Sequence, residues 1–289
     1  IVVFMKEPII SVSGLRGIVG ESLTPAVAMN YTAAYLDELP DGPVVLSRDG
    51  RATGPMLADI IRGSLASLGR TCLDAGVAAT PTAGILVRQH RAAGGIQVSA
   101  SHNPPEYNGM KLFGGDGRVI SEAAGAEVSD RYRKMEEGKE NDSNRWASHD
   151  RVAVARSLDD TIGRHLESIL KIVAAQRIRA AKFRVVLDSN HGAGSVLGRP
   201  LLEALGCDVE VLGGTPDGRF DHPPEPLAAN LASVSPAIPQ LGAAVGFCQD
   251  PDADRLAVID ENGCYLGEEY TLALCVDRVL RHTPGPVVA

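Results

Sequence analysis

The feature that most limits the fold is the alternation of short apolar, β-branched runs with longer stretches of helical periodicity. Apolar runs at 44–46, 72–73 and 95–98 are separated by helical patterns at 54–68 and 82–91. This alternation is typical of βαβ units built around a largely parallel sheet. Two more helices are expected at 25–38, where Thr24-Pro25 supplies a cap and a first-turn proline, and at 122–137.

A second block of the same style follows a polar stretch at 138–151, which has almost no aliphatic residues and is typical of a linker or surface loop. Its expected elements are a helix at 157–175, a strand at 183–187, a helix at 194–205, and strands at 208–212 and 243–247. A third block begins with a strand at 256–259 and a helix at 267–281. We therefore expect tandem, similar α/β domains with mixed, largely parallel sheets.

The expected domains are residues 1–150, residues 151–256, and the start of a third at 257–289. The chain begins with Ile1, and residues 286–289 read as part of a further strand. We therefore expect a fragment of a longer protein, truncated in its third domain.

Charge and composition exclude several classes of function. The 28 Lys and Arg against 36 Asp and Glu give a net charge of −8, and no basic stripe is present, so nucleic acid is not an expected partner. No apolar run reaches the ~18 residues of a membrane span, so no membrane partner is expected. Five cysteines lack CxxC spacing and sit mostly among apolar neighbours, which favours reduced, buried thiols and a cytoplasmic location: Cys72, Cys207, Cys248, Cys264 and Cys275.

An unusual segment, 99–111, directly follows the expected strand at 95–98, at the sheet edge where open α/β folds bind ligands. Pro104-Pro105 and Asn108-Gly109 disfavour regular structure, so the segment is expected to be a rigid loop. That loop would present hydroxyls, an imidazole and an amine from Ser99, Ser101, His102 and Lys111. The ordinary alternative is a well-capped surface loop.

A second unusual segment has three carboxylates at alternate positions, Asp250, Asp252 and Asp254, between two apolar runs. With no lysine among them they repel unless a cation neutralises them, and Mg²⁺ is the natural occupant. A solvated acidic turn is the ordinary alternative. A helix-loop-helix calcium site would use Glu261 as its twelfth position, but it needs glycine where Arg255 stands and helices where strands are expected.

Two glycine-rich segments are less specific. In the segment 11–20, glycines allow close backbone approach and Arg16 can bind phosphate oxygens, although glycine-rich turns with one arginine are common. The segment 192–198, with Glu210 further on, has the glycine spacing of a dinucleotide fingerprint. We favour the alternative for this segment, a tight strand-to-helix turn whose glycines permit close packing.

Taken together, these segments resemble the α-D-phosphohexomutase superfamily. Ser-Ala-Ser-His-Asn-Pro at 99–104 is similar to its phosphoserine loop, Asp-Pro-Asp-Ala-Asp-Arg at 250–255 to its magnesium loop, and Ser-Gly-Leu-Arg-Gly at 13–17 to its N-terminal loop. Order and spacing agree along the whole chain. Smaller pieces also match, among them Thr80-Pro81-Thr82 and Asp188 with Gly192 and Gly194, whereas Gln249 and Pro251 depart from the pattern.

The resemblance implies an architecture of four domains around one cleft, of which this chain would hold the first two and the opening of the third. It implies a mutase that interconverts hexose 1-phosphate and hexose 6-phosphate through a phosphorylated Ser101 and a bisphosphorylated sugar. One Mg²⁺ per chain would be held by Asp250, Asp252, Asp254 and the phosphoserine, with hexose 1,6-bisphosphate as activator.

The other residues receive roles from the same resemblance. Arg16 and Lys111 would neutralise charge, and Lys111 or His102 would handle the hydroxyl proton. Arg255 would pair with the phosphoserine or the carboxylates, and it would bind substrate or phosphate together with Ser13 and Asn103.

Several alternatives stay open at this point. A phosphoglucosamine mutase fits the same motifs, so the hexose can be mannose, glucose or glucosamine, and the protein can be a monomer or a homodimer. A non-catalytic sugar-phosphate binding protein has no need of three metal aspartates. A serine hydrolase is disfavoured because no GxSxG elbow exists and His102 is not expected to reach the hydroxyl of Ser101.

Overall fold

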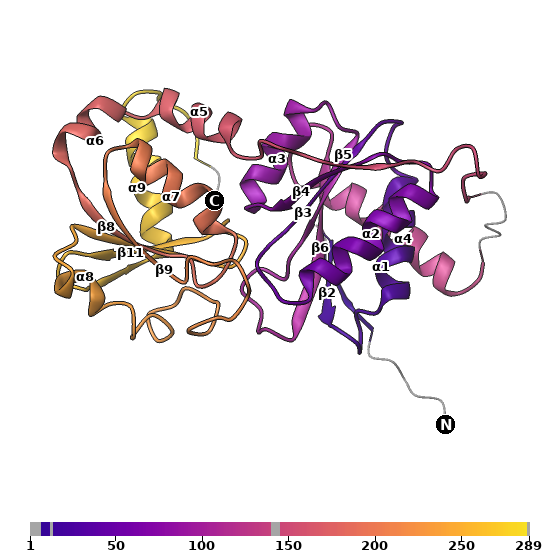
Figure 1. Ribbon diagram of the computed structural model, residues 1–289, viewed down its shortest axis with the longest axis horizontal. Helices are drawn as coiled ribbons and strands as arrows, with labels where there is room; N and C mark the ends of the chain where they lie inside the picture. The colour runs from indigo at the N-terminus through magenta and orange to yellow at the C-terminus, as the bar shows by residue number, and fades with distance from the viewer. Residues whose placement is uncertain (1–6, 12–13, 140–144, 288–289) are drawn as a thin grey trace.

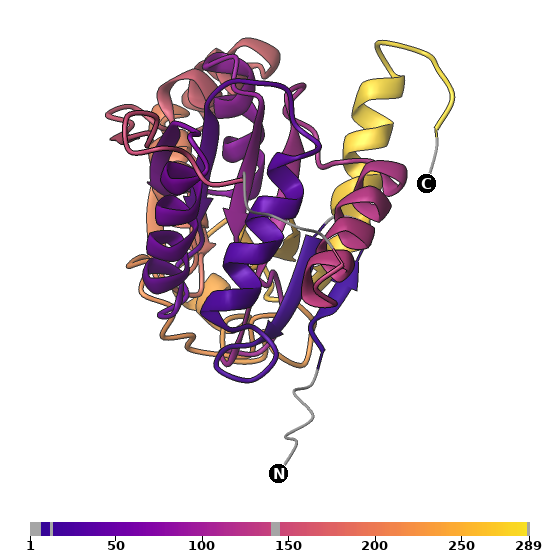
Figure 2. The ribbon, with the colours of Figure 1, turned by 90° about the vertical axis from the view of Figure 1, so that its right-hand side faces the viewer.

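A computed structural model describes residues 7–11, 14–139 and 145–287. Two α/β units lie side by side along the long axis of the molecule (Figure 1). In the view along that axis the first unit covers much of the second (Figure 2).

The first unit is built on a seven-stranded sheet with the strand order β1-β2-β6-β5-β3-β4-β7. β3 is parallel to β4 and β5, β4 is parallel to β7, and β6 is antiparallel to β5 and β2. The strands are β1 (Ile9–Ser11), β2 (Gly14–Ile18), β3 (Val44–Arg48), β4 (Cys72–Val77), β5 (Gly94–Val98), β6 (Tyr107–Gly114) and β7 (Ala155–Ser157). The helices are α1 (Pro25–Leu36), α2 (Gly54–Ser67), α3 (Thr80–Gln89) and α4 (Glu122–Glu136).

Alternation along β3 explains why helices cover both faces of this sheet. Val44 and Leu46 belong to the core cluster that also contains residues of α1, α2 and α4. Val45, between them, belongs to a second cluster with residues of α3. Because successive side chains of a strand point to opposite faces, a strand that is apolar throughout requires a helical layer on each side.

The second unit is built on a five-stranded sheet with the order β12-β11-β10-β8-β9. β8 is parallel to β9 and β10, and β11 is antiparallel to both β10 and β12. Its strands are β8 (Arg184–Asp188), β9 (Asp208–Leu212), β10 (Val245–Gln249), β11 (Leu256–Asp260) and β12 (Tyr265–Gly267). Its helices are α5 (Gly163–Ile172), α6 (Ala175–Ala181), α7 (Gly194–Ala204), α8 (Ala237–Gln240) and α9 (Glu268–Leu280).

The two sheets repeat one pattern, since β5, β3 and β4 have the same relative directions as β10, β8 and β9. The hairpin partners β6 and β11 also occupy equivalent places. The expectation of tandem, similar α/β units is therefore confirmed. Among the described strands, however, antiparallel neighbours are as common as parallel ones, because each unit adds a hairpin and a further antiparallel strand beside its parallel core.

Both sheets extend past the boundaries expected at 150 and 256. β7 joins the edge of the first sheet, and β11 and β12 pair with β10 in the second. The division into three domains stays a prediction. The single helix expected at 157–175 is instead β7 followed by α5 and α6, because Val173 adopts an extended conformation between the two helices. Residues 284–287 form no strand, and the rest of the strand expected at 286–289 lies outside the described residues.

The cysteines differ partly from expectation. Cys72 and Cys248 are buried and Cys207 is half-buried, but Cys264 and Cys275 are exposed, and all five are unpaired. Among the described residues, no helix combines the length and apolar character that a bilayer crossing requires.

Candidate functional site

The two unusual loops lie at equivalent places in the two units. Ser101 follows β5 in the connection to β6, and Asp250 follows β10 in the connection to β11. The two connections meet where the units face each other, and the Ser101 hydroxyl donates a 2.9 Å hydrogen bond to Oδ2 of Asp250. Residues 149 positions apart are thereby brought into one site.

Ser101 is held in an unusual backbone conformation at the tip of its loop. Its φ angle is +52°, in the left-handed region that side chains other than glycine rarely adopt, and only 3% of the residue is exposed. Its amide donates to Oγ of Ser99 at 2.8 Å, and that hydroxyl donates to Oδ2 of Asp49 at 2.7 Å. The loop is therefore anchored from beneath by a chain of buried hydrogen bonds.

His102 lies closer to the Ser101 hydroxyl than we expected. Its Nδ1 is 3.3 Å from the Ser101 hydroxyl, so the prediction that His102 would not reach its neighbour is wrong. The positive φ of Ser101 turns the two adjacent side chains toward each other. Burial and the nearby charge of Arg255 lower the pKa of His102, which favours the neutral imidazole that can accept a proton.

The three aspartates form a compact group of oxygen ligands. Asp250 and Asp252 are fully buried, Asp254 is partly exposed, and one ligand atom from each lies within 4.8 Å of the others. Oδ1 of Asp252 is buried without a hydrogen-bond partner in the described part of the chain. A buried carboxylate oxygen with no donor is costly unless a cation approaches it, so this set of residues fits a hard, oxygen-preferring metal ion.

Lys111 lies beside this group. Its Nζ donates to Oδ2 of Asp252 at 2.9 Å and to Oδ2 of Asp254 at 2.6 Å. Burial alone would lower the pKa of this amine, but the two carboxylates raise it on balance, so Lys111 stays charged. The residue belongs to strand β6 and not to the loop where we expected it, because the loop ends at 106.

The pKa values of Asp250 and Asp252 shift in opposite directions. Burial, followed by the charges of Asp252 and Asp254, raises the pKa of Asp250. Burial also acts to raise that of Asp252, but Lys111 and hydrogen bonds to neighbouring side chains lower it. The carboxylate next to the serine therefore gains most from an added positive charge.

Arg16 lies on a strand, although a glycine-rich turn was expected. β2 pairs with β6, and Arg16 is opposite Gly109, where an added Cβ would lie 2.4 Å from the carbonyl oxygen of Leu15. The glycines of this region thus permit close strand approach. The charge of Arg16 is near enough to His102 to contribute to its lowered pKa.

The remaining predicted residues are less directly placed. The side-chain amide of Asn103 donates to the carbonyl of Ala100 within the loop. Nη1 of Arg255 lies 3.8 Å from Oε1 of Glu225 and 3.9 Å from Oε1 of Glu268, and its backbone amide bonds to Asp250. Its expected pairing with the phosphoserine or the carboxylates stays a prediction. Ser13 lies outside the described residues.

Three site residues were not assigned roles from the sequence. Thr80, the first residue of α3, donates its amide to the carbonyl of Asp252 at 2.8 Å and its hydroxyl to Oδ2 of the same residue. Asp49 and Arg51 follow β3 and lie under the Ser101 loop. A signal was present, because Asp49 and Arg51 come within three residues of the end of β3, which begins with three apolar residues and ends at the sheet edge where Ser101 also lies.

The glycine spacing at 192–198 serves packing, as the favoured interpretation held. A Cβ on Gly192 would lie 2.6 Å from the backbone of Pro251, and one on Gly194 would lie 2.0 Å from the side chain of Gln249. These glycines therefore seat the aspartate loop against α7. The calcium-loop alternative also fails, since strands β10 and β11 flank the aspartates.

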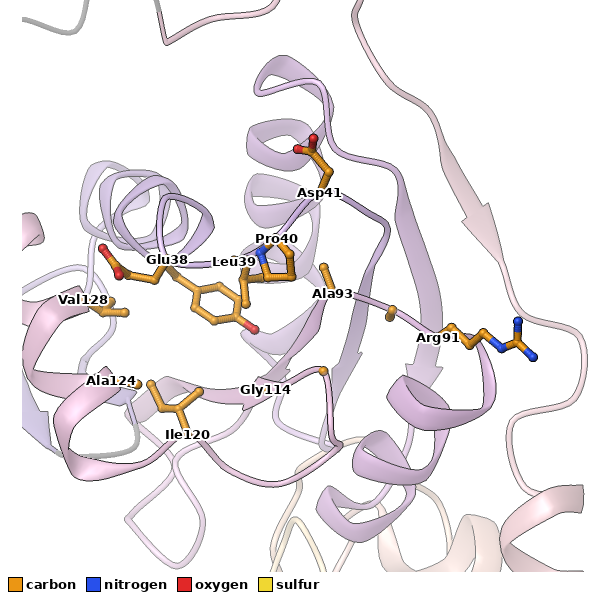
Figure 3. A pocket seen from close by; sticks show the side chains of 13 residues that line it. Glu38, Leu39, Pro40, Asp41, Arg91, Ala93, Gly114, Ile120, Ala124 and Val128 are labelled. Carbon is orange, nitrogen blue, oxygen red and sulfur yellow. The ribbon is translucent and has the colours of Figure 1, made fainter.

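A separate cavity of about 400 Å³ lies in the first unit, at the end of β5 opposite to Ser101 (Figure 3). Glu38, Leu39, Asp41 and Arg91 line it together with residues of α4. No residue predicted for the site contributes to its wall.

Known proteins match most of the length of this chain. The family model described as "Phosphoglucomutase/phosphomannomutase, alpha/beta/alpha domain I" matches residues 8–139, and the model for domain II matches residues 163–263. A phosphoglucomutase/phosphomannomutase of Thermococcus kodakarensis is 36% identical over 94% of this chain and 59% of its own length. A phosphoglucosamine mutase of a Synechococcus species is 34% identical over 90% of this chain and 54% of its own.

A solved structure agrees in fold. A phosphoglucomutase/phosphomannomutase family protein from Burkholderia thailandensis superimposes with a TM-score of 0.76 at 26% identity, over 96% of this chain and 61% of that one. The chain thus spans somewhat more than half the length of the relatives it matches.

Proposed function

Because this chain belongs to the phosphoglucomutase/phosphomannomutase family, we propose that it carries the phosphoryl-transfer centre of a phosphohexomutase that interconverts hexose 1-phosphate and hexose 6-phosphate. The observation that supports this most is the buried Ser101 hydroxyl 2.9 Å from the first of three clustered aspartates. An ordinary surface loop would leave a serine in water, whereas here the hydroxyl lies beside a group of residues suited to a cation.

The proposed reaction has two transfers. The bond between phosphorus and Oγ of phosphorylated Ser101 breaks as a free sugar hydroxyl attacks, which yields a hexose bisphosphate. After this intermediate reorients, Ser101 takes the other phosphoryl group, and the product keeps the one that it received. Positioning and charge neutralisation supply most of the catalysis in such transfers.

Asp250, Asp252 and Asp254 would hold one Mg²⁺. When bound, this ion supplies a Lewis acid that neutralises charge on the transferred group. The unpartnered Oδ1 of Asp252 supports this assignment.

His102 is the better placed of the two proton carriers considered. It is neutral and within 3.3 Å of the Ser101 hydroxyl, whereas Lys111 is held charged by two carboxylates. We assign to His102 the transfer of the proton from the attacking sugar hydroxyl. We assign to Lys111 and Arg16 the neutralisation of charge on the transferred phosphoryl group. Ser13, Asn103 and Arg255 remain candidates for binding substrate or its phosphate.

The substrate is a phosphorylated hexose, with hexose 1,6-bisphosphate as activator. Both phosphoglucomutase/phosphomannomutase and phosphoglucosamine mutase specificity fit the relatives. The cytoplasmic location and the monomeric or homodimeric state stay predictions from the sequence.

Incubation with glucose 1,6-bisphosphate tests the proposal. With Mg²⁺ present, peptide mass spectrometry should find phosphate on Ser101, and chelation of the metal should abolish its transfer. A Ser101→Ala variant is the control. Phosphate found only on Ser99, or on no serine between 99 and 101, would show that the proposed nucleophile is wrong, and a bisphosphate that binds without transfer would favour a binding protein.

A further inference from the structure

A fully buried arginine lies directly beneath the nucleophile loop. Arg51 is 1% exposed, and its guanidinium donates to the carbonyl oxygens of Ser101 and Pro104, each at 2.7 Å, and of Tyr107 at 2.9 Å. It also donates to the carbonyl of Asn103. A single side chain therefore binds three carbonyls of the Ser101 loop and that of Tyr107, where β6 begins.

The guanidinium is itself fixed from two directions. Nε of Arg51 donates to Oδ2 of Asp49 at 3.2 Å, and that carboxylate also accepts from Ser99 of the same loop. On the other side, the guanidinium carbon lies 5.2 Å from the ring centroid of Phe220, which belongs to the second unit. The anchor of the serine loop is thus in contact with both units.

We propose that Arg51 is a positioning residue that holds the Ser101 loop in its reactive shape, an inference that rests on the phosphoryl-transfer function proposed above. Ser101 has a φ of +52°, which is unfavourable and persists only where surrounding contacts enforce it. The bond to the Ser101 carbonyl and those to Asn103, Pro104 and Tyr107 fix the backbone on the C-terminal side of the strained residue. Among the described residues, Arg51 hydrogen-bonds to this backbone and to Asp49, and not to the three aspartates or the serine hydroxyl. The charges of Asp252 and Asp250 are near enough to act on its pKa, and lysine at this position would keep the positive charge that they face.

The planar, five-donor shape of arginine is essential to this role. A lysine at position 51 would keep the charge opposite Asp49, but its ammonium has three donors at one point and does not span four carbonyls. Arg51→Lys should therefore leave the fold intact and loosen the loop. Displacement of a reacting group by about 1 Å can cost about 100-fold in rate.

The test compares Arg51→Lys with the wild-type chain and with Arg62→Lys. Arg62 is the control because, like Arg51, it bonds to aspartate side chains of the same unit, in its case those of Asp59 and Asp74. Three measurements are made. The first is the kinetics of Ser101 phosphorylation by glucose 1,6-bisphosphate, which gives the maximal rate and the half-saturating concentration. The others are amide hydrogen exchange over 101–107 and Mg²⁺ affinity by calorimetry.

For Arg51→Lys we expect a maximal rate lower by about 100-fold, faster exchange confined to the loop, and unchanged half-saturation and Mg²⁺ affinity. Arg62→Lys should match the wild type in all three. A wild-type rate, unaltered loop exchange, or exchange that rises throughout the unit would each overturn the inference. If Arg51→Lys does not fold, Phe220→Leu replaces it, because this variant removes only the ring beside the guanidinium. Phe220→Leu must still slow phosphorylation of Ser101, and an unchanged rate in that variant rejects the positioning role of Arg51.

The failure of the proposed function would look different. In that case the wild-type chain itself would accept no phosphate on Ser101. Amide hydrogen exchange over 101–107 in Arg51→Lys would then be the remaining test of the positioning role, and unaltered exchange would reject that role.

Discussion

The carboxylate of Asp252 is buried, and its two oxygens differ in their hydrogen bonding. It is fully buried, yet one of its oxygens accepts bonds from Thr80 and Lys111 while the other has no partner in the described part of the chain. Lys111 offsets only part of the charge of three clustered carboxylates. A divalent cation would complete the neutralisation and satisfy the free oxygen.

Asp252→Asn should therefore weaken Mg²⁺ binding by at least about tenfold, or about 1.4 kcal/mol. The substitution keeps the shape of the residue and removes one negative charge. Asp260→Asn is a matched control, because that carboxylate bonds only within its own turn, to Asn262 and Cys264. Titration calorimetry measures the Mg²⁺ affinity of both variants. Equal affinity of Asp252→Asn and the wild type would rule out the metal assignment.

His222 makes the stability of the second unit depend on pH. Its Nε2 lies 2.9 Å from Oδ2 of Asp188, the last residue of β8, and both side chains are buried. Burial acts to lower the pKa of His222, but the hydrogen bond and charge of Asp188 outweigh it and raise that pKa above its ordinary 6.5. A raised pKa means that the folded state binds the proton more tightly than the unfolded chain does.

The resulting stabilisation is complete below pH 6.5 and is lost as the pH rises through the raised pKa of His222. The free energy of unfolding in urea should thus fall as the pH rises above about 6.5. His222→Gln should remove that part of the fall, because glutamine does not titrate. An identical pH profile for the variant and the wild type would contradict this account.

Sequence patterns identified the chemical groups of the site better than their partners. Ser101 and the three aspartates stand out because their residue types and spacing are unusual next to apolar strands. The contacts of Lys111 with Asp252 and of Thr80 with the same residue join positions 141 and 172 apart, and no local pattern encodes such distances. The reach of His102 depends on the positive φ of Ser101, which sequence does not reveal for a residue other than glycine.

At the scale of elements, helix α3 joins the first unit to the aspartate loop of the second. Its first residue, Thr80, bonds twice to Asp252, and the helix has no side-chain cap of its own. The exposed amides at a helix N-terminus favour a nearby negative charge. The loop therefore stabilises the helix while the helix fixes the loop.

Thr80→Val should lower Mg²⁺ affinity by roughly threefold to tenfold, because it leaves the shape intact but removes a hydrogen bond of about 1 kcal/mol that orients Asp252. Thr82→Val is the control on the same helix, since the hydroxyl of Thr82 contacts His165 and not the aspartates. Titration calorimetry measures the Mg²⁺ affinity of both variants. A loss of affinity in Thr82→Val as large as that in Thr80→Val would refute a specific role for Thr80.

Elements with clear end signals were predicted well, and glycine-rich strands were not. The helix at 25–36 begins where Thr24 caps it, and its hydroxyl accepts from the amide of Val27. β2 and the first part of β6 were mistaken for loops because they contain Gly14, Gly17 and Gly109. These glycines serve close approach of neighbouring chain segments, as their blocked Cβ positions show, and such tertiary use is indistinguishable from a turn in the sequence.

At the scale of the whole molecule, the site exists only where the two units meet. Ser101 belongs to the first unit and Asp250 to the second, so the 2.9 Å hydrogen bond between them depends on how the units pack. Gly50, the second residue after β3, is at this junction. A Cβ there would lie 2.1 Å from the carbonyl oxygen of His191 in the second unit, and that carbonyl is fixed by the amide of Gly218.

Gly50→Ala should therefore push the units apart, since neither backbone can yield alone. All three aspartates lie on one loop of the second unit, but Thr80 of the first unit helps to orient Asp252. Mg²⁺ affinity should therefore fall by no more than about tenfold, as for Thr80→Val, while phosphorylation of Ser101 should slow by about 100-fold. Gly63→Ala provides the control, because this glycine lies in α2 with open space around it. Alanine there should raise the free energy of unfolding by up to about 1 kcal/mol. It should change neither the rate of Ser101 phosphorylation nor the Mg²⁺ affinity. Parallel phosphorylation and calorimetric assays separate the two effects. If Gly50→Ala phosphorylates as fast as Gly63→Ala, the packing of the two units does not control the reaction.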